Sequence, residues 1–297
     1  MPIVTEFEYV KPKDMDEALH VFSLYKENAM ALAGGTDLVV RLKENLVRPE
    51  VVVDIKALEE LAGFSLKGDI LRIGALVTFS DLIDSPLIKS KFPLLREAAL
   101  TVASTGVRNR ATVAGNICSA VPSADSAPAL AVYEAEVLVR GIKGERRVPM
   151  SEWFAGPRKT ALAPEEIVAA IELKLPAVKH AGCYMKLSRY EGEDLAQGGV
   201  AALVLADDTY RVAVCALGPK PARCPKTEEA LNGAKLNEKA LSRAKEIILR
   251  EISPISDIRS SKEYRLHMTQ VMLGRALQNA AARLSGKGSG YGKGNIV

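Results

Sequence analysis

Ala33-Gly34-Gly35-Thr36-Asp37-Leu38 is the stretch of sequence that says most about the fold. It joins a short apolar run over residues 29–33, typical of a buried strand, to an amphipathic helix that starts at Thr36-Asp37. Two successive glycines can adopt positive φ and turn several backbone N–H groups toward one point. The start of a helix adds further donors and a partial positive charge. The segment therefore suits a phosphate or diphosphate group, although the same glycines could make only a tight turn.

A second small-sided segment, Thr112-Val113-Ala114-Gly115-Asn116, lies within a polar, glycine-bearing loop that we expect from Thr105 to Asp125. The loop continues through Ser123-Ala124-Asp125 into a predicted helix. A loop of this length inside a compact domain is usually functional or disordered. Its low charge and small residues favour packing against a ligand, with an ordinary surface loop as the alternative.

Neither segment matches the common nucleotide-binding fingerprints. The Gly34-Gly35 pair lacks the third glycine and the later acidic residue of a Rossmann motif. Gly286-Lys287-Gly288-Ser289-Gly290 has no strand before it and no helix after it, and it fails the P-loop pattern. The sequence therefore predicts a phosphate-binding fold of another type.

The opening of the chain predicts a compact α/β unit of about 60 residues. Asp14 can cap a helix whose apolar face carries Leu19 and Phe22, and residues 51–55 are β-branched and strand-like. Further on, we expect strands near residues 71–75 and 166–175, a hairpin around Gly141 and Gly144, and helices from Phe79 and over residues 93–104.

A cluster of Pro, Lys, His and Gly over residues 176–182 predicts a domain boundary. Beyond it the pattern indicates a three-stranded antiparallel meander followed by helices, which is typical of a small α+β domain. Its strands are expected at residues 183–187, 199–205 and 210–217, and its helices at 227–231, 238–250 and 264–284. We therefore divide the chain into 1–176 (with subdomains of about 1–58 and 59–176), 177–285, and a flexible Gly- and Lys-rich tail, 286–297.

The composition is that of a globular protein, with 297 residues and a formal net charge of +4 that is spread along the chain. A nucleic-acid-binding protein would gather Lys and Arg into a stripe or arm, and pairs such as Arg146-Arg147 are too few for that. We expect no nucleic-acid partner. No apolar run approaches the ~18–20 residues that cross a bilayer, and the first residues have no apolar core of signal-peptide length, so we expect a cytoplasmic protein without a membrane span.

Cysteine and histidine give no indication of a metal centre. Cys118, Cys183, Cys215 and Cys224 form no CxxC pair, so we expect reduced, mostly packed thiols and no iron–sulfur or zinc site on this chain. His20, His180 and His267 are predicted to be solvated or packed. No nucleophile or acid–base pair is evident, and no catalytic residue is assigned.

At the two glycine segments the sequence resembles the FAD-binding medium subunit of the xanthine dehydrogenase and carbon monoxide dehydrogenase type of molybdenum hydroxylase. The resemblance runs over nearly the whole chain. It is carried by Ala33-Gly34-Gly35-Thr36-Asp37-Leu38 and Thr112-Val113-Ala114-Gly115-Asn116, and is supported by Phe7-Glu8-Tyr9-Val10-Lys11-Pro12, Ile73-Gly74-Ala75, Val107-Arg108-Asn109, Tyr184-Met185-Lys186-Leu187-Ser188-Arg189, Ser261-Lys262-Glu263-Tyr264-Arg265 and Arg275-Ala276-Leu277.

The resemblance implies an α+β protein, with a two-part FAD-binding domain of the vanillyl-alcohol-oxidase (PCMH) type before the small C-terminal domain. It implies FAD, with the first segment on one side of the pyrophosphate and the second on the other. Because the three histidines are predicted to be solvated or packed, we expect the FAD to be non-covalent. Asp125 would form a hydrogen bond with the flavin or its ribityl chain. Lys186 would approach the polar edge of the flavin ring; the alternative is that Lys186 is a solvated strand lysine. The implied cofactor-binding set is Ala33, Gly34, Gly35, Thr36, Asp37, Leu38, Thr105, Thr112, Ala114, Gly115, Asn116, Ser123, Asp125 and Lys186.

Two features depart from the family pattern. A second double glycine is usual where this chain has Ala114-Gly115, and an alanine is tolerable there only if its φ stays negative. The segment from Tyr190 to Asp194 is one residue longer than in some relatives. Tyr190 would stack on the flavin or shield it, or be an exposed loop tyrosine.

The function implied by the resemblance is electron transfer. A partner large subunit would oxidise the substrate on a molybdenum cofactor, and 2Fe–2S clusters on a small subunit would deliver the electrons to FAD on this chain. An external acceptor such as NAD would then receive them, in an assembly expected as a dimer of heterotrimers. The alternatives are a self-contained flavin oxidoreductase of the same fold and a flavin-free scaffold subunit.

Overall fold

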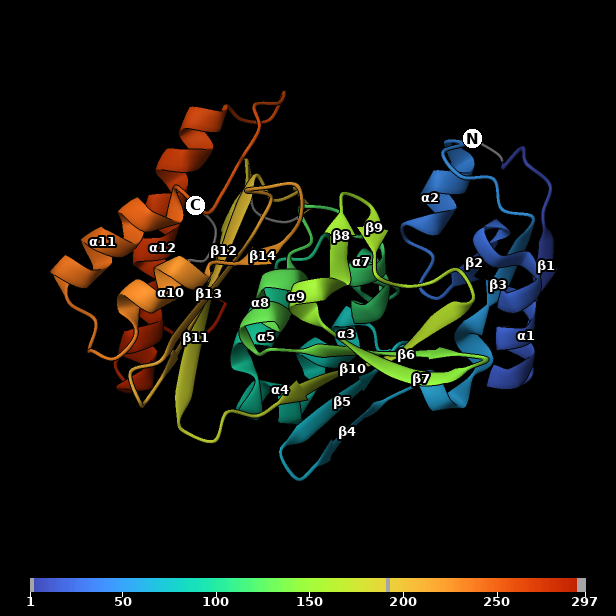
Figure 1. Ribbon diagram of the computed structural model, residues 1–297, viewed down its shortest axis with the longest axis horizontal. Helices are drawn as coiled ribbons and strands as arrows, with labels where there is room; N and C mark the ends of the chain where they lie inside the picture. The colour runs from blue at the N-terminus through green and yellow to red at the C-terminus, as the bar shows by residue number, and fades with distance from the viewer. Residues whose placement is uncertain (1–2, 191–192, 293–297) are drawn as a thin grey trace.

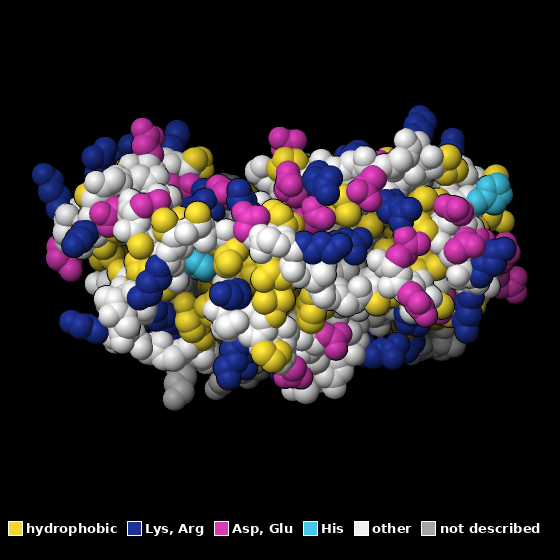
Figure 2. All heavy atoms as spheres, turned by 90° about the horizontal axis from the view of Figure 1, so that it is seen from below, with side chains coloured by type: hydrophobic (Ala, Val, Ile, Leu, Met, Phe, Trp, Pro, Cys, Tyr) yellow, Lys and Arg dark blue, Asp and Glu magenta, His cyan; other side chains and the backbone are white. Residues whose placement is uncertain are grey.

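The computed structural model describes residues 3–190 and 193–292. Three parts lie side by side along the long axis in Figure 1: a small N-terminal unit, a central sheet with its helices, and a C-terminal sheet backed by three helices. Within the described ranges, no helix is both long and apolar enough to span a bilayer. Basic and acidic side chains are interspersed over the face seen in Figure 2, and no basic stripe crosses it.

The N-terminal unit is a three-stranded parallel sheet in the order β1-β3-β2, with α1 beside it. The Asp14 side chain accepts the N–H of Glu17, so the predicted helix cap is confirmed. The Gly34-Gly35 turn comes directly after β2 and leads into α2. The elements are β1 (Glu8–Val10), α1 (Met15–Tyr25), η1 (Lys26–Asn28), β2 (Ala29–Leu32), α2 (Leu38–Lys43), β3 (Val51–Asp54), η2 (Ile55–Ala57) and η3 (Glu59–Leu61).

The central unit is a five-stranded sheet in the order β4-β5-β10-β6-β7, in which every neighbouring pair is antiparallel. The predicted hairpin is confirmed, because Gly141 pairs with Gly144 across a two-residue turn. The strands are β4 (Phe64–Lys67), β5 (Ile70–Gly74), β6 (Glu136–Gly141), β7 (Gly144–Pro149) and β10 (Glu166–Lys174), and a separate small hairpin is formed by β8 (Phe154–Gly156) and β9 (Lys159–Thr160).

Along the chain, short helices connect β5 to β6. They are α3 (Phe79–Asp84), α4 (Pro86–Lys91), α5 (Pro93–Leu100), α6 (Thr105–Arg108), α7 (Val113–Cys118) and α8 (Ser126–Val132), with α9 (Met150–Trp153) following β7. The prediction of an irregular loop from Thr105 to Asp125 is therefore wrong, since α6 and α7 lie within it. These helices have four and six residues, too short to give a clear periodic pattern.

The C-terminal domain has the predicted antiparallel meander and one strand more. Its sheet runs β11-β12-β13-β14, and the two-residue β14 was not predicted. Three helices cover one face of this sheet in Figure 1. The elements are β11 (His180–Leu187), β12 (Gly198–Leu205), β13 (Tyr210–Cys215), β14 (Ala222–Arg223), α10 (Pro225–Leu231), α11 (Glu238–Ile248) and α12 (Lys262–Leu284).

The two faces of strand β11 pack in two different hydrophobic cores. Cys183, Met185 and Leu187 pack in the core under α10–α12, whereas Tyr184 belongs to the core of the central unit. Alternate residues of a strand point to opposite faces, so one strand can serve both cores. The division at residues 176/177 falls between β10 and β11, at the start of an extensive shared interface.

The tail was predicted to be flexible, and its described part folds back onto the protein. Arg283 donates to the carbonyl of Ser289 at 2.9 Å, and the N–H of Gly292 donates to Glu97 at 2.8 Å. Residues 293–297 lie outside the described residues.

Candidate flavin site

The Gly34-Gly35 turn requires glycine at both positions, for different reasons. Gly35 has a φ of +77°, in the left-handed region that side chains disfavour. At Gly34 an added methyl group would overlap the carbonyl oxygen of Arg110. Arg110 stands two residues before Thr112, so the backbone of the first segment is in direct contact with the residues that lead into the second.

The backbone N–H groups of residues 34–37 have no hydrogen-bond acceptor among the residues that the structure describes. Asp37, the N-cap residue of α2, makes no capping bond with its side chain. Unpaired donors that converge on one point are the usual arrangement for binding a phosphate oxygen. The first segment therefore presents several free donors at its turn.

The second segment is the start of a helix rather than a loop. Thr112 is the N-cap of α7, and its hydroxyl accepts the N–H of Gly115 at 2.9 Å. A methyl on Gly115 would stand 2.9 Å from that hydroxyl, so glycine keeps this cap tight. Ala114 lies inside α7 and is absent from the residues with positive φ, which satisfies the condition that the sequence set for an alanine here. Its N–H has no acceptor in the described parts of the chain.

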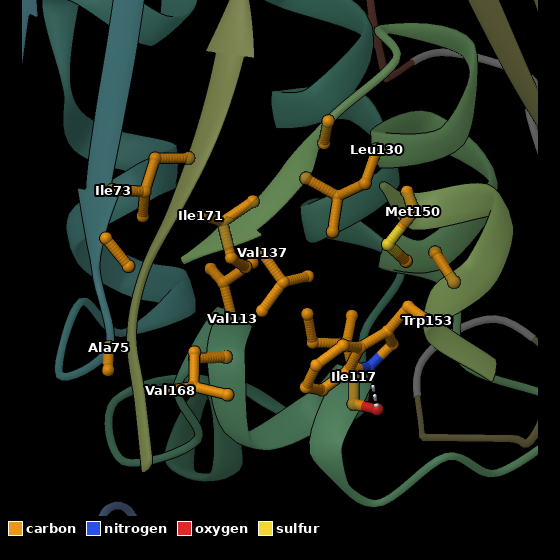
Figure 3. Packing of buried hydrophobic residues seen from close by; sticks show 14 of the residues in the cluster. Ile73, Ala75, Val113, Ile117, Leu130, Val137, Met150, Trp153, Val168 and Ile171 are labelled. Carbon is orange, nitrogen blue, oxygen red and sulfur yellow. Dashed lines mark hydrogen bonds between the residues drawn. The ribbon is translucent and has the colours of Figure 1, made fainter. Parts of the chain in front are cut away.

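Helix α7 is fixed firmly against the central sheet. Val113 lies toward Ile171 of β10 in Figure 3. Ile117 lies beside Trp153, whose indole N–H donates to the carbonyl of Ile117 at 3.1 Å. Asn116 accepts the hydroxyl of Ser126 at 2.7 Å, which ties α7 to the start of α8. The second segment is therefore held in place from both sides.

Arg158 lies at this site and was not predicted from the sequence. It sits at the tip of the β8–β9 hairpin with a φ of +56°, and its N–H donates to the carbonyl of Ala120, just past α7, at 2.8 Å. Its guanidinium lies 4.0 Å from the carboxylate of Asp37 in the first segment. The hairpin thus brings a half-exposed cation beside both segments. No sequence motif indicates this hairpin, because its strands have only three and two residues.

Asp125 and Lys186 form a buried ion pair, with 2.9 Å between Nζ and Oδ2. Only 2% of the Lys186 side chain is exposed, so the alternative of a solvated strand lysine is wrong. Its ammonium group also donates to the carbonyl of Thr101 at 2.8 Å. An ammonium group carries three donors, and these bonds use two of them.

Tyr184 completes this pair by donating its hydroxyl to Oδ1 of Asp125 at 2.7 Å. Burial raises the pKa of the Asp125 carboxyl, while the charge of Lys186 and the two donated hydrogen bonds act to lower it. Burial, helped by the neighbouring Asp125 carboxylate, also raises the pKa of Tyr184 well above its usual value, which keeps its hydroxyl protonated and donating. The pair is linked to the second segment through Ser126, which follows Asp125 and bonds Asn116.

The remaining predicted residues have less defined places. Thr36, after the Gly34-Gly35 turn, is exposed. Asp37 is half-buried, and its carboxylate lies 3.6 Å from the guanidinium of Arg41. Thr105 begins α6 and accepts from Arg108 at 3.0 Å, while Ser123 is half-buried before Asp125. Tyr190 is 56% exposed with its ring near the guanidinium of Arg189, and residues 191–192 of that segment lie outside the described residues.

In the described ranges 3–190 and 193–292, no group of three or more His, Cys, Asp or Glu residues lies close enough together to hold a metal ion. His20 and His267 are exposed, and His180 is half-buried at the start of β11. Cys183, Cys215 and Cys224 are buried, and burial raises the pKa of the Cys215 thiol to about 12.

The comparisons with known families agree with this geometry. Residues 5–176 match the FAD-binding domain in molybdopterin dehydrogenases, and residues 183–280 match the C-terminal domain of the CO dehydrogenase flavoprotein. The two glycine segments, Asp125 and Arg158 all fall within the first match, and Lys186 falls within the second.

Similar proteins and structures cover almost the whole chain. The putative xanthine dehydrogenase FAD-binding subunit XdhB of Escherichia coli (strain K12) is 36% identical over 265 residues, which is 87% of this chain and 91% of that protein. The carbon monoxide dehydrogenase medium chain of Hydrogenophaga pseudoflava is 32% identical over 95% of this chain and 99% of its own. A solved structure of that dehydrogenase, lacking the Mo-pyranopterin moiety, superimposes with a TM-score of 0.91 at 32% identity, covering 95% of this chain and 99% of the solved one.

Fold and site thus define a flavoprotein of the two-part FAD-binding type, and the predicted fold class is confirmed. The chain belongs to the FAD-binding medium subunits of the molybdopterin dehydrogenases, the class of oxidoreductase that includes xanthine and CO dehydrogenases. Its residues fit the cofactor: the glycine turn leaves no room for a side chain at Gly34, and the N–H groups of residues 34–37 and of Ala114 have no acceptor within the described ranges.

Proposed function

We propose that this chain holds FAD without a covalent bond and passes electrons from iron–sulfur clusters of a partner subunit to an external acceptor such as NAD. The observation that supports the proposal is the close contact of Gly34 with the carbonyl of Arg110, two residues before the second segment. In the described residues, the N–H groups of residues 34–37 and of Ala114 have no acceptor. FAD supplies the chemistry, because it can take up single electrons and release two together as a hydride.

In this proposal the chain's own residues bind and orient. The N–H groups of residues 34–37 and of Ala114 bond the pyrophosphate, and Arg158 offsets part of its negative charge. Thr112 and Gly115 hold α7 in the conformation that leaves the N–H of Ala114 without an acceptor among the described residues. Ala33, Leu38, Thr105, Asn116 and Ser123 complete the proposed binding set.

Lys186 has the second role in the proposal. Asp125 and the Thr101 carbonyl hold its ammonium group at a buried position beside the flavin, and one of its N–H groups has no acceptor among the described residues. A fixed positive charge there stabilises a negative charge on the reduced ring and raises its reduction potential. Because both partners are almost fully buried, little water screens that charge.

We also propose that substrate oxidation takes place on a partner chain. The similar proteins include subunits of dehydrogenases for xanthine, carbon monoxide, caffeine and nicotinate, so one medium-subunit sequence pattern accompanies unlike substrates. The proposed partners are a small iron–sulfur subunit and a large molybdopterin subunit, in a dimer of heterotrimers. The cytoplasm is the proposed location of this complex.

The purified chain tests this proposal directly. We expect it to be yellow, to release all its flavin on acid precipitation, and to lose the oxidised flavin absorbance when NADH is added without oxygen. Flavin that stays with the precipitate would contradict non-covalent binding. Flavin that dithionite reduces but NADH does not would contradict NAD as the acceptor.

A further inference from the structure

Glu97, in α5 of the first domain, is fully buried and saturated with hydrogen bonds. Its carboxylate accepts the backbone N–H of Tyr184 at 2.8 Å and the N–H of Gly292 at 2.8 Å. Two N–H groups of Arg283 donate to it at 2.8 and 3.1 Å. Four donors match the roughly four lone-pair sites of a carboxylate, so these three segments of the chain meet on one side chain.

Arg283 fixes the end of the chain and the strand β11 at the same time. Its guanidinium donates to the carbonyl of Gly182 at 2.7 Å and lies 4.1 Å from the centre of the Tyr291 ring. The Tyr291 hydroxyl in turn accepts the N–H of Gly182 at 3.3 Å. Both polar backbone atoms of Gly182 are therefore held by residues from the last turn of α12 and the tail that follows it.

The contact of β11 with α5 is close. A methyl group on Gly182 would stand 2.6 Å from a side-chain carbon of Leu94. Gly182, Tyr184 and Lys186 share one face of β11, because side chains alternate along a strand. The strand that carries Tyr184 and Lys186 is thus pressed onto α5 at one end and bonded to Asp125 at the other.

We propose that Glu97 is a positioning residue for the flavin site: with Arg283 and the tail through Gly292 it sets the position of β11, and so of Tyr184 and Lys186 against Asp125. This inference rests on the proposed function, in which Lys186 lies beside the flavin. Glu97 touches neither the proposed pyrophosphate site nor the ion pair itself and acts through the backbone of Tyr184.

Glu228 provides a matched control. It is buried, it accepts a strand N–H from Val212 at 2.8 Å, and it binds Arg223 through two bonds of 2.6 Å. Glu228→Gln therefore weakens the same kind of carboxylate–strand contact, but at β13, because Glu228 binds Val212 and not Tyr184. Deletion of residues 286–297 is a milder change at the Glu97 side, because it leaves the Glu97–Arg283 pair in place.

The experiment compares Glu97→Gln, Glu228→Gln and the tail deletion in the FAD-loaded chain, by hydrogen exchange of β11 and by the reduction potential of the flavin. We expect exchange of the β11 amides to speed up by about tenfold in Glu97→Gln, and less in the tail deletion. In both, the flavin potential falls because Lys186 is less firmly held, whereas Glu228→Gln leaves it unchanged.

Unchanged exchange in β11 would overturn the role of Glu97 in holding the strand. Faster exchange with an unchanged flavin potential would overturn its positioning role at the flavin. If Glu97→Gln does not fold, the tail deletion gives the same two readouts. A wild-type chain that binds no FAD would refute the proposed function, while the exchange of β11 would still report separately on Glu97.

Discussion

Lys186 and Asp125 come from different domains and meet as an ion pair of 2.9 Å that is almost closed to solvent. A buried pair of this kind adds little net stability, because the desolvation of both charges offsets their attraction. Breaking it is costly, because the remaining charge stays buried without a partner. Net stability therefore does not account for the pair, whereas the proposed role at the flavin does.

Lys186→Met is expected to lower the free energy of unfolding by about 3–5 kcal/mol at neutral pH. In this variant the raised pKa of Asp125 loses the opposing effect of Lys186, so the folded state holds a proton that the unfolded state releases. Stability is then greatest below the unfolded pKa and is lost as the pH rises through the folded pKa. Urea unfolding at about pH 5 and about pH 8 checks this. A variant with equal stability at both would contradict the burial of a lone carboxylate.

Ala114→Gly would give the second segment a double glycine, yet we expect no gain in FAD binding. Ala114 already has a helical φ, so glycine frees no donor and loosens α7 by about 1 kcal/mol. Titration with FAD should give a dissociation constant within about twofold of wild type. Ala129→Gly in α8 is the control for buried helical alanine. A large gain in affinity would show that the methyl group of Ala114 hinders the cofactor.

Arg158→Ala is expected to weaken FAD binding by about fivefold at low salt, in line with less than about 1 kcal/mol for a half-exposed charge. The loss should shrink as ionic strength rises. Lys159→Ala, which removes the neighbouring exposed cation, should leave the dissociation constant unchanged. Equal losses in the two variants would indicate a general charge effect and remove the specific role of Arg158.

Asp257→Asn tests a stabilising contact made by a residue outside the proposed FAD-binding set. Asp257 binds Arg259 and the buried Arg265, and these bonds hold the pKa of its carboxyl well below the usual range. Its contribution is complete above the unfolded pKa and is lost as the pH falls through the folded value. The variant should lose about 1.5–3 kcal/mol at neutral pH, and the difference from wild type should narrow below about pH 4.

Asp69→Asn is the control for Asp257→Asn, because Asp69 is an exposed partner of Lys174 at 3.5 Å and should contribute almost nothing. A constant difference between Asp257→Asn and wild type down to low pH would mean that charge is not what Asp257 contributes.

The sequence predicted the fold wherever periodicity or capping was strong. The cap at Asp14, the hairpin between Gly141 and Gly144 and the meander from β11 to β13 all form where they were expected. It failed over residues 105–125, because a helix of four to six residues is fixed by tertiary contacts such as that of Trp153 with Ile117.

The sequence predicted two glycine segments for the site, and the structure adds the contacts that connect these parts of the chain. Contact between Gly34 and Arg110, and the approach of Arg158, depend on how distant segments pack, which no local pattern encodes. The tail was predicted to be flexible from its composition, but Tyr291 and Gly292 find partners in Arg283 and Glu97 that lie far away in sequence or on another helix.

The most direct measurement is an FAD titration of the apo chain, comparing wild type with Gly34→Ala and with Gly156→Ala as control. At Gly34 a methyl overlaps the Arg110 carbonyl and forces the two segments apart, whereas nothing lies within 4 Å of a methyl at Gly156. We expect tight binding by wild type and Gly156→Ala, and a loss of about tenfold or more in a folded Gly34→Ala. Equal affinity in all three, or no binding by wild type, would contradict the claim that these two segments together hold the cofactor.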